Sequence, residues 1–426
     1  MTMKTILLLI IFLIPLFGAV KSFGYEQIKI LFFILSVSLI GFLWILRKPA
    51  IKWNAVKTYS ALLVDVLFLT SVFGIDPATS FFGREPYFQG WVLYAYLCLF
   101  SLLVSQAQIK LEKWALVLCS SAFIVSLLAV KDWVLLNIFS QSVPVYAGRV
   151  VSTFGQPNFY AGFLLLSLPF SYYLFKTSTG TSQVKRLSCF GLFSSLISIA
   201  GIFVSYSRSA ILLGLVLLSL ALIDQLKFKL KTGLFLIAAF ILMGIFLSVK
   251  LSSGLLESEF LKPIQTNNPD LTKESVEKRV YLWPLTFKIA LQRPLSGYGL
   301  ENIGLAVNNY FEKDKHRLFE ENLNISPVLI SLKELYIDHS HNYILDLLLF
   351  SGIFGVLGWL GLLGALFLNL RQKHHGRNTF ILTTGLITYL IWVQFQNQSI
   401  VQLVYFWLLV GLINRKESFE KEPEIS

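Results

Sequence analysis

Residues 28–46 read IKILFFILSVSLIGFLWIL, a run with a single charged side chain, and this stretch decides the fold class. At about 1.5 Å of rise per residue, a helix of this length reaches across the roughly 30 Å apolar core of a bilayer. Backbone N–H and C=O groups in lipid must be satisfied within the structure, and the run is too long for a barrel strand. It therefore predicts a membrane helix.

Apolar runs of this kind recur along the 426 residues. The predicted spans are approximately 5–20, 28–46, 56–74, 91–107, 114–130, 158–175, 188–204, 210–223, 233–249, 342–368, 379–395 and 399–413. The sequence thus predicts an all-α polytopic membrane protein with about 12 transmembrane helices. The first run resembles a signal peptide but lacks a small-residue cleavage site, so we expect it to be retained.

Composition and charge agree with this class. Only 14% of the residues are charged, whereas a soluble domain averages about 25%. The net charge of +12 is better explained by basic cytoplasmic loops than by a nucleic-acid partner. Lys and Arg gather in the alternate loops 47–57, 108–113, 176–187, 224–232 and 371–378 and in the C-terminal tail. The positive-inside rule then places both termini in the cytoplasm.

The predicted organisation has four parts. Residues 1–130 form N-terminal transmembrane helices, 131–370 a catalytic region, 371–413 C-terminal transmembrane helices, and 414–426 a cytoplasmic tail. The hydrophilic segment 250–340, between helices 9 and 10, is predicted to lie outside. Within it, residues 273–292 are typical of an amphipathic helix bent near Pro284, with Trp283, Phe287, Ala290 and Leu291 on one apolar face.

Arg208 is the most unusual polar residue on the predicted outer side. It lies in the turn Ser205-Tyr-Ser-Arg-Ser209 between two apolar helices, where a charge either snorkels to the interface or meets an anion. Ser207 and Ser209 flank it and can supply hydroxyl donors. Ser209 is also a candidate N-cap of the following helix.

Two histidines precede the tenth span, in Asp338-His339-Ser340-His341-Asn342. Their spacing does not place them on one helix face, and neither HExxH nor a paired Asp-x-Asp motif occurs, so no metal site or other cofactor is predicted. Asn342 is a candidate helix cap, and Asp346 lies one turn deeper. The structural alternatives are a hydrogen-bonded histidine cap and a paired or protonated carboxylate.

The predicted topology brings Arg149, Arg208, Arg279 and both histidines to the same side of the membrane. One guanidinium group can donate two parallel hydrogen bonds to phosphate oxygens. A neutral histidine can accept a proton from a hydroxyl group. This combination favours group transfer from a diphosphate-linked donor, because the arginines would stabilise the departing diphosphate.

Four segments resemble motifs of the O-antigen ligase and O-antigen polymerase family of bacterial envelope glycosyltransferases. They are Phe154-Gly-Gln-Pro-Asn-Phe-Tyr-Ala-Gly162, similar to G-N-P-N-x-x-A; Ser207-Arg-Ser-Ala210; Arg279-Val-Tyr-Leu-Trp283 with Pro294-Leu-Ser-Gly-Tyr-Gly299; and His341-Asn-Tyr343 with Gly352 and Gly355. Gln156 stands where the family motif has Asn. The resemblance covers roughly residues 145–370.

The resemblance implies a multi-span enzyme at the outer face of the bacterial inner membrane. Its donor would be an undecaprenyl-pyrophosphate-linked glycan, and its acceptor a lipid A-core sugar, another lipid-linked glycan or a protein hydroxyl. Arg208 and Arg279 would bind the diphosphate, with Arg149 a weaker candidate. His341, or alternatively His339, would be the base. The supporting residues would be Ser207, Ser209, Asn158, Asn342, Trp283 and Asp346.

Two alternatives come from other functional classes. A transporter or flippase for lipid-linked sugars would place its polar site near the bilayer midplane. Only Asp65 and Asp346 are predicted to lie that deep, whereas the other candidate residues are predicted at one interface. A non-catalytic envelope membrane protein would tolerate substitution of the arginines and histidines.

Overall fold

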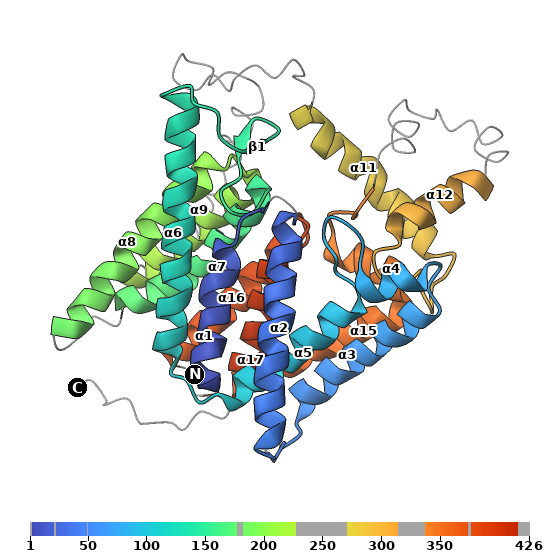
Figure 1. Cartoon of the computed structure of the whole chain (residues 1–426), viewed down its shortest axis with the longest axis horizontal. Coiled ribbons are helices and arrows are strands. Elements are labelled where there is room, and N and C mark those ends of the chain that lie inside the picture. The colour runs from blue at the N-terminus through green and yellow to red at the C-terminus, as the bar shows by residue number, and fades with distance from the viewer. Residues whose placement is uncertain are drawn as a thin grey trace.

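The computed structural model describes residues 2–20, 23–48, 50–176, 182–226, 271–313, 337–373 and 376–415. Its helices are α1 (Met3–Leu13) with the 3-10 turn η1 (Ile14–Leu16), α2 (Tyr25–Leu46), α3 (Ala55–Val72), α4 (Pro77–Phe82), α5 (Trp91–Gln106), α6 (Leu111–Asn137), α7 (Pro157–Lys176), α8 (Ser182–Val204), α9 (Arg208–Leu226), α11 (Leu271–Ala290), α12 (Ile303–Lys313), α15 (Tyr343–Gln372), α16 (Arg377–Trp392) and α17 (Ile400–Ile413). A short antiparallel hairpin joins β1 (Val145–Tyr146) to β2 (Arg149–Val150). Figure 1 shows how these elements are arranged.

The fold is mostly helical, as predicted, and the predicted spans within the described residues coincide with helices. Among the described residues, six helices are long and apolar enough to cross a membrane: α2, α3, α6, α8, α9 and α15. Shorter apolar helices lie at Met3–Leu16, Trp91–Gln106 and Ile400–Ile413. The predicted span 233–249 and most of the tail lie outside the described residues, so twelve crossings stay a prediction.

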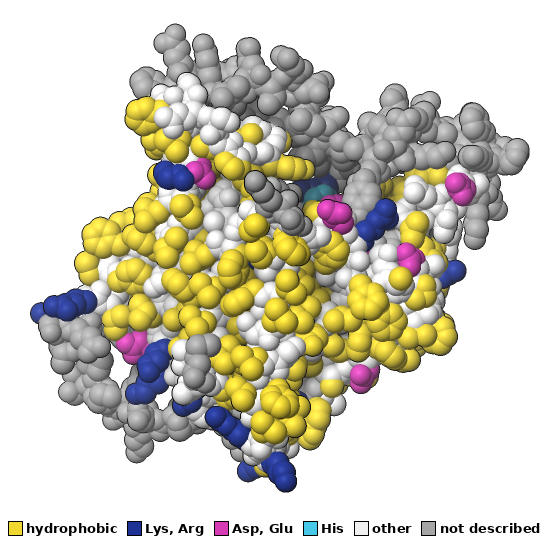
Figure 2. Space-filling view, in the orientation of Figure 1, with side chains coloured by type: hydrophobic (Ala, Val, Ile, Leu, Met, Phe, Trp, Pro, Cys, Tyr) yellow, Lys and Arg dark blue, Asp and Glu magenta, His cyan; other side chains and the backbone are white. Residues whose placement is uncertain are grey.

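Large apolar side chains cover the outside of the bundle. On α2, Leu35, Phe42 and Ile45 are each more than 60% exposed. Figure 2 shows a broad hydrophobic surface across the middle of the molecule, with several Lys and Arg side chains along its lower edge. Soluble monomers rarely expose apolar patches of this extent, so this surface is typical of a protein that faces lipid.

Two helices form the centre of the bundle. Every residue of α17 is buried, and most of α7 is buried between α6 and α8. A helix that is apolar on all sides is stable only where other elements surround it. These central helices are therefore well suited to hold residues at their ends in fixed positions.

Several helices meet at one end of the bundle, the upper end in Figure 1. The amide of Tyr343, at the start of α15, donates to the carbonyl of Val393 at the end of α16 (3.2 Å). The amide of Ile400, which begins α17, donates to the carboxylate of Glu26 in the first turn of α2 (2.8 Å). The hairpin, α11 and α12 lie at this same end.

The helix predicted for residues 273–292 is present as α11, which continues past Pro284. Its predicted apolar face is wrong in part, because Phe287 and Leu291 are exposed. Ala290 is buried as predicted, and the other buried apolar side chains are Leu282, Leu285 and Ile289. The packing of α11 against α15 decides which face of α11 is buried, and the sequence of α11 alone does not reveal that contact.

The glycines of the segment 294–299 let it pack directly on the backbone of α15. Tyr298 and Gly299 donate backbone hydrogen bonds to Leu349 and Phe350 (both 2.9 Å), and Ile353 donates to Pro294 (2.7 Å). Gly352 interrupts the helical conformation of α15 at this point, with φ of 61°. The segment after α11 is thereby fixed to the helix that follows the two histidines.

Substituting Gly297 by alanine is expected to destabilise the protein by about 2 kcal/mol or more, because an alanine would be strained at a φ of 64°. Its Cβ would also lie 2.4 Å from the carbonyl oxygen of Phe350. Thermal unfolding in detergent measures this loss. Gly364→Ala in α15 is the matched control, since no atom lies within 4 Å of a Cβ there. Equal melting temperatures for the two variants would contradict this account.

Candidate active site

The N-terminus of α15 organises the loop that carries both histidines. Asn342 is the N-cap, as predicted, and its side chain accepts a hydrogen bond from the amide of Leu345 (3.1 Å). Asp346, in the first turn, accepts from the amide of Ser340 (2.8 Å). His341 has a positive φ of 60°, so the backbone turns sharply at this residue. The loop 337–342 is thus tied down on both sides of His341.

His339 lies in an acidic environment. Its Nδ1 is 3.3 Å from a carboxylate oxygen of Asp346, and the two side chains are buried. Burial alone would lower the pKa of His339, but the hydrogen bond and charge of Asp346, together with Asp338 and Glu301, raise that pKa to about 9. His339 is therefore an imidazolium at neutral pH, held as a cation among carboxylates.

His341 lies in the opposite electrostatic setting. Burial and the positive charge of Arg279 lower its pKa to about 4, in spite of the opposing charges of Asp338 and Asp346. The imidazole is neutral at neutral pH, and its buried Nδ1 has no hydrogen-bond partner among the described residues. A neutral imidazole of this kind can accept a proton.

Arg279 and Trp283 lie one turn apart on α11 and act on the same loop. The indole N–H of Trp283 donates to the carbonyl of Ser340 (2.9 Å), which fixes α11 against the histidine loop. Burial lowers the pKa of Arg279, and its buried Nε has no hydrogen-bond partner among the described residues. The i, i+4 spacing of these residues places the guanidinium on the side of the helix that faces the loop.

Arg208 is the first residue of α9 and follows a tight turn. In that turn the amide of Ser207 donates to the hydroxyl of Ser205 (3.0 Å). The Ser207 hydroxyl is buried with no hydrogen-bond partner in the described structure. The prediction that Ser209 caps α9 is wrong, because the helix begins one residue earlier. The Ser209 hydroxyl instead accepts from the side-chain amide of Gln396 (2.9 Å).

Arg149 begins the second strand of the hairpin and lies near Arg208. Burial, and the positive charge of Arg208, lower the pKa of Arg149, which its neighbours Tyr160 and Tyr146 partly oppose. Two guanidinium groups close enough to interact in this way repel each other. An anion between them would relieve the repulsion.

A buried ion pair supports the loop that leads from Arg149 to Asn158 in the first turn of α7. The Lys29 ammonium is 3.9 Å from Glu26, donates to the carbonyl of Thr153 (2.9 Å), and lies 4.2 Å from the centre of the Phe154 ring. Since Glu26 also binds the start of α17, this pair connects the loop before α7 to the centre of the bundle.

The loop 393–399, between α16 and α17, connects the surroundings of Arg208 to the loop that carries His339 and His341. Gln396 binds Ser209, next to Arg208, and the backbone carbonyl of Gln394 accepts from Asn342, next to His341 (3.5 Å). Gln396 also lines a small cavity of about 30 Å³ together with His339 and Asp346. A cavity of this size holds a water molecule.

Sequence reasoning missed this loop and its supports. Gln394, Gln396, Asn397 and Gln398 place four amide side chains in five residues between two apolar helices, which was the available signal. Glu301 was also missed: its carboxylate accepts from the backbone amides of Arg84 and of Gln89 (the latter at 2.7 Å). Gln89 in turn donates to the carbonyl of Gln398 (2.6 Å).

The predicted residues therefore form two groups at the same end of the bundle. Arg149 and Arg208 with Ser209 form the first, and Arg279, Trp283, His339, His341 and Asp346 form the second. Figure 2 shows a histidine side chain beside Lys or Arg side chains toward the upper end of the molecule. Asn158 lies half-buried at the start of α7, below the loop that follows the hairpin.

Comparison with known proteins bears on residues from both groups. No curated protein matches the sequence significantly. A family model described as O-antigen ligase matches residues 193–360, a region that includes Arg208, Arg279, His339 and His341. Over this region the chain is similar to the O-antigen ligase family, which confirms the resemblance noted in the motifs.

Proposed function

We propose that this protein transfers a glycan from an undecaprenyl-pyrophosphate-linked donor to an acceptor hydroxyl at the outer face of the bacterial inner membrane. The similarity of residues 193–360 to the O-antigen ligase family supports glycan transfer by a multi-pass membrane protein in general. The arginine and histidine groups support the more specific reaction.

One observation carries this proposal most directly. Arg279 and His341 are close enough for the charge of Arg279 to act on His341, and each has a buried polar atom with no hydrogen-bond partner in the part of the chain that the structure describes. Buried polar atoms without partners are uncommon in stable folds and often mark a place where a ligand binds. A guanidinium beside a neutral imidazole suits an anionic leaving group beside a hydroxyl nucleophile.

The environments of the two histidines favour different roles. His341 is neutral and is the proposed proton acceptor. His339, protonated and bound to Asp346, has no free lone pair to take a proton, and we assign it a positioning role. Ser340 lies between them and binds both Trp283 and Asp346, so its contacts would keep His341 in place.

The proposed reaction is a single displacement. The oxygen of the acceptor hydroxyl attacks the anomeric carbon while His341 accepts its proton, and the bond from that carbon to the diphosphate oxygen breaks. The electron pair leaves with undecaprenyl pyrophosphate, whose negative charge Arg208 and Arg279 would stabilise, assisted by Arg149. Attack opposite the leaving group would invert the anomeric carbon. No cofactor takes part in this scheme.

Purified protein in detergent, supplied with a polyprenyl-diphosphate-linked glycan and an acceptor, is expected to release polyprenyl diphosphate and form a glycosylated product without any ion gradient. Parallel reactions with lipid A-core, a second lipid-linked glycan and a hydroxyl-bearing peptide would assign the acceptor class. Movement of the donor across vesicle membranes without product in any reaction would instead support a flippase.

A further inference from the structure

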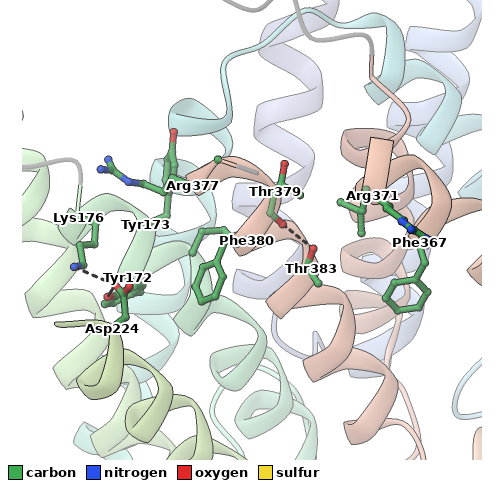
Figure 3. Close-up of a pocket in the computed structure, with 13 residues that line it drawn as sticks. Tyr172, Tyr173, Lys176, Asp224, Phe367, Arg371, Arg377, Thr379, Phe380 and Thr383 are labelled. Carbon is green, nitrogen blue, oxygen red and sulfur yellow. Dashed lines mark hydrogen bonds and ion pairs between the residues drawn. The ribbon is translucent and has the colours of Figure 1, made fainter. Parts of the chain in front are cut away.

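The helices α7 and α9 pack against each other and begin at the same level. In the first turn of α7, Tyr160 lies near Ser205, which is just before the start of α9. Toward their other ends, Tyr172 of α7 donates a hydrogen bond to Asp224 of α9, as Figure 3 shows. Tyr172 is 15 residues after the first residue of α7, and Asp224 is 16 residues after the first residue of α9. These two stretches are each about 23 Å long in a helix, so the helices run parallel.

Two hydroxyl groups at this level are buried and have no hydrogen-bond partner in the part of the chain that the structure describes. They belong to Tyr160, which is 0% exposed, and to Ser207, which directly precedes α9 and is 1% exposed. Ser205 lies near Tyr160. Its hydroxyl, however, already donates to the carbonyl of Ile202 (2.6 Å) and accepts from the backbone amide of Ser207 (3.0 Å). The hydroxyl protons of Tyr160 and Ser207 are therefore available to a ligand.

The surroundings of these two hydroxyls are positively charged. The guanidinium of Arg149 interacts electrostatically with both Tyr160 and Arg208. The first turns of α7 and α9 add the positive ends of two helix dipoles. Asp132 also lies near Tyr160, but its carboxylate is paired with Lys131 (2.9 Å). Two helix starts and two guanidinium groups together favour an anion at this place.

Burial without a partner does not by itself indicate a ligand, because the hydroxyl of Tyr405 in α17 has both properties. That hydroxyl lies against Gly385 in the interior of the bundle, and its electrostatic neighbour is Cys119 rather than an arginine. Tyr160 and Ser207 differ from it in lying together beside two arginines. Their hydroxyls are thus placed where a bound anion can accept both protons.

We propose that Tyr160 and Ser207 donate hydrogen bonds to the phosphate oxygens of a diphosphate that is bound between Arg149 and Arg208. Phosphate oxygens accept several hydrogen bonds at once, and hydroxyl donors beside guanidinium groups fill the positions that the arginines leave. During transfer, these hydroxyls stabilise the same negative charge on the leaving group as the arginines do. The identity of the ligand rests on the proposed function, whereas the placement of the two hydroxyls does not.

Binding of undecaprenyl diphosphate to the purified full-length protein in detergent tests this proposal. Tyr160→Phe removes only the hydroxyl and is expected to raise Kd at least about tenfold, because a hydrogen bond to a charged group is lost. Ser207→Ala should raise Kd in the same way. The melting temperature of ligand-free Tyr160→Phe should stay at the wild-type value, since no described hydrogen bond is removed.

Tyr405→Phe is the matched control, with the same substitution at a similarly buried tyrosine, and it should bind undecaprenyl diphosphate as the wild-type protein does. Undecaprenol carries no diphosphate and should bind equally to the wild-type protein and to both tyrosine variants. An unchanged Kd for undecaprenyl diphosphate in Tyr160→Phe, or an equal rise in Tyr405→Phe, would overturn the proposal.

Two further results separate a ligand contact from other roles of Tyr160. A clear fall in the melting temperature of ligand-free Tyr160→Phe would assign the hydroxyl a structural role and overturn the proposal. An equal loss of affinity for undecaprenol would place Tyr160 on the lipid chain and also overturn it. Diphosphate binding that depends on Tyr160, in a wild-type protein that transfers no glycan to any acceptor, would support this inference and contradict the proposed function.

Discussion

His341→Asn is expected to lower kcat for glycan transfer by about 10²- to 10⁴-fold, the usual contribution of a positioned general base. Asparagine is the informative replacement because it tolerates the left-handed backbone of His341 and so should leave the loop folded. Initial rates with the lipid-linked donor and a saturating acceptor measure the effect. A rate within threefold of the wild-type value would remove His341 from the reaction.

The pH dependence of kcat/KM separates the two histidines. Since a base must be unprotonated, the rate falls as the pH drops through the pKa of that base. With His341 as the base, activity is expected to hold from neutral pH down to the region of pH 4–5. With His339 as the base, activity would instead rise with pH up to about 9. Arg279→Gln removes a nearby positive charge and should move the acid limb upward toward the ordinary histidine value near 6.5.

His339→Asn provides the matched comparison. This variant loses the contact with Asp346, so a reduced thermal stability and a smaller fall in kcat are both expected. The acid limb should remain below neutral pH, because His341 still takes the proton. If kcat/KM of the wild-type protein rises up to about pH 9 and this rise disappears in His339→Asn, then His339 is the base and His341 is not.

The membrane class was predictable from the sequence because apolar runs must be helical in lipid. The helix at 273–292 was also predictable from its pattern. Its buried face was not, since the contact of α11 with α15 decides it. The Asn342 cap followed from a local rule, whereas the Ser209 cap failed because Ser209 binds Gln396, a residue 187 positions away.

The candidate site was predictable in its residue types but not in its electrostatics. The motifs identified Arg208, Arg279 and His341 as candidates. The opposite environments of His339 and His341 depend on Asp346, Asp338, Glu301 and Arg279, which come together only in the folded chain. The loop 393–399 was missed because amide-rich turns between membrane helices are commonly just polar connections.

Arg208→Gln and Arg279→Gln are each expected to lower kcat/KM by about 10²- to 10³-fold, the range measured when one donor to a developing negative charge is removed. Arg293→Gln is the matched control: Arg293 lies just beyond α11, is exposed, and stacks on Tyr298 with its guanidinium 5.1 Å from the ring centre. It should keep nearly full activity. Similar losses in all three variants would point to net charge rather than to a diphosphate site.

The Arg208→Gln/Arg279→Gln double variant tests whether the two arginines act on the same leaving group. They lie in different groups of residues, joined by way of Ser209, Gln396 and the loop 393–399. If both bind one diphosphate, the loss of either disturbs the position of that diphosphate, and the double variant should lose less than the product of the single effects. Lysine in place of either arginine keeps the charge but not the paired hydrogen bonds, so it should recover only part of the rate. Strictly multiplicative losses would mean that the arginines act independently, and the shared diphosphate site would then be wrong.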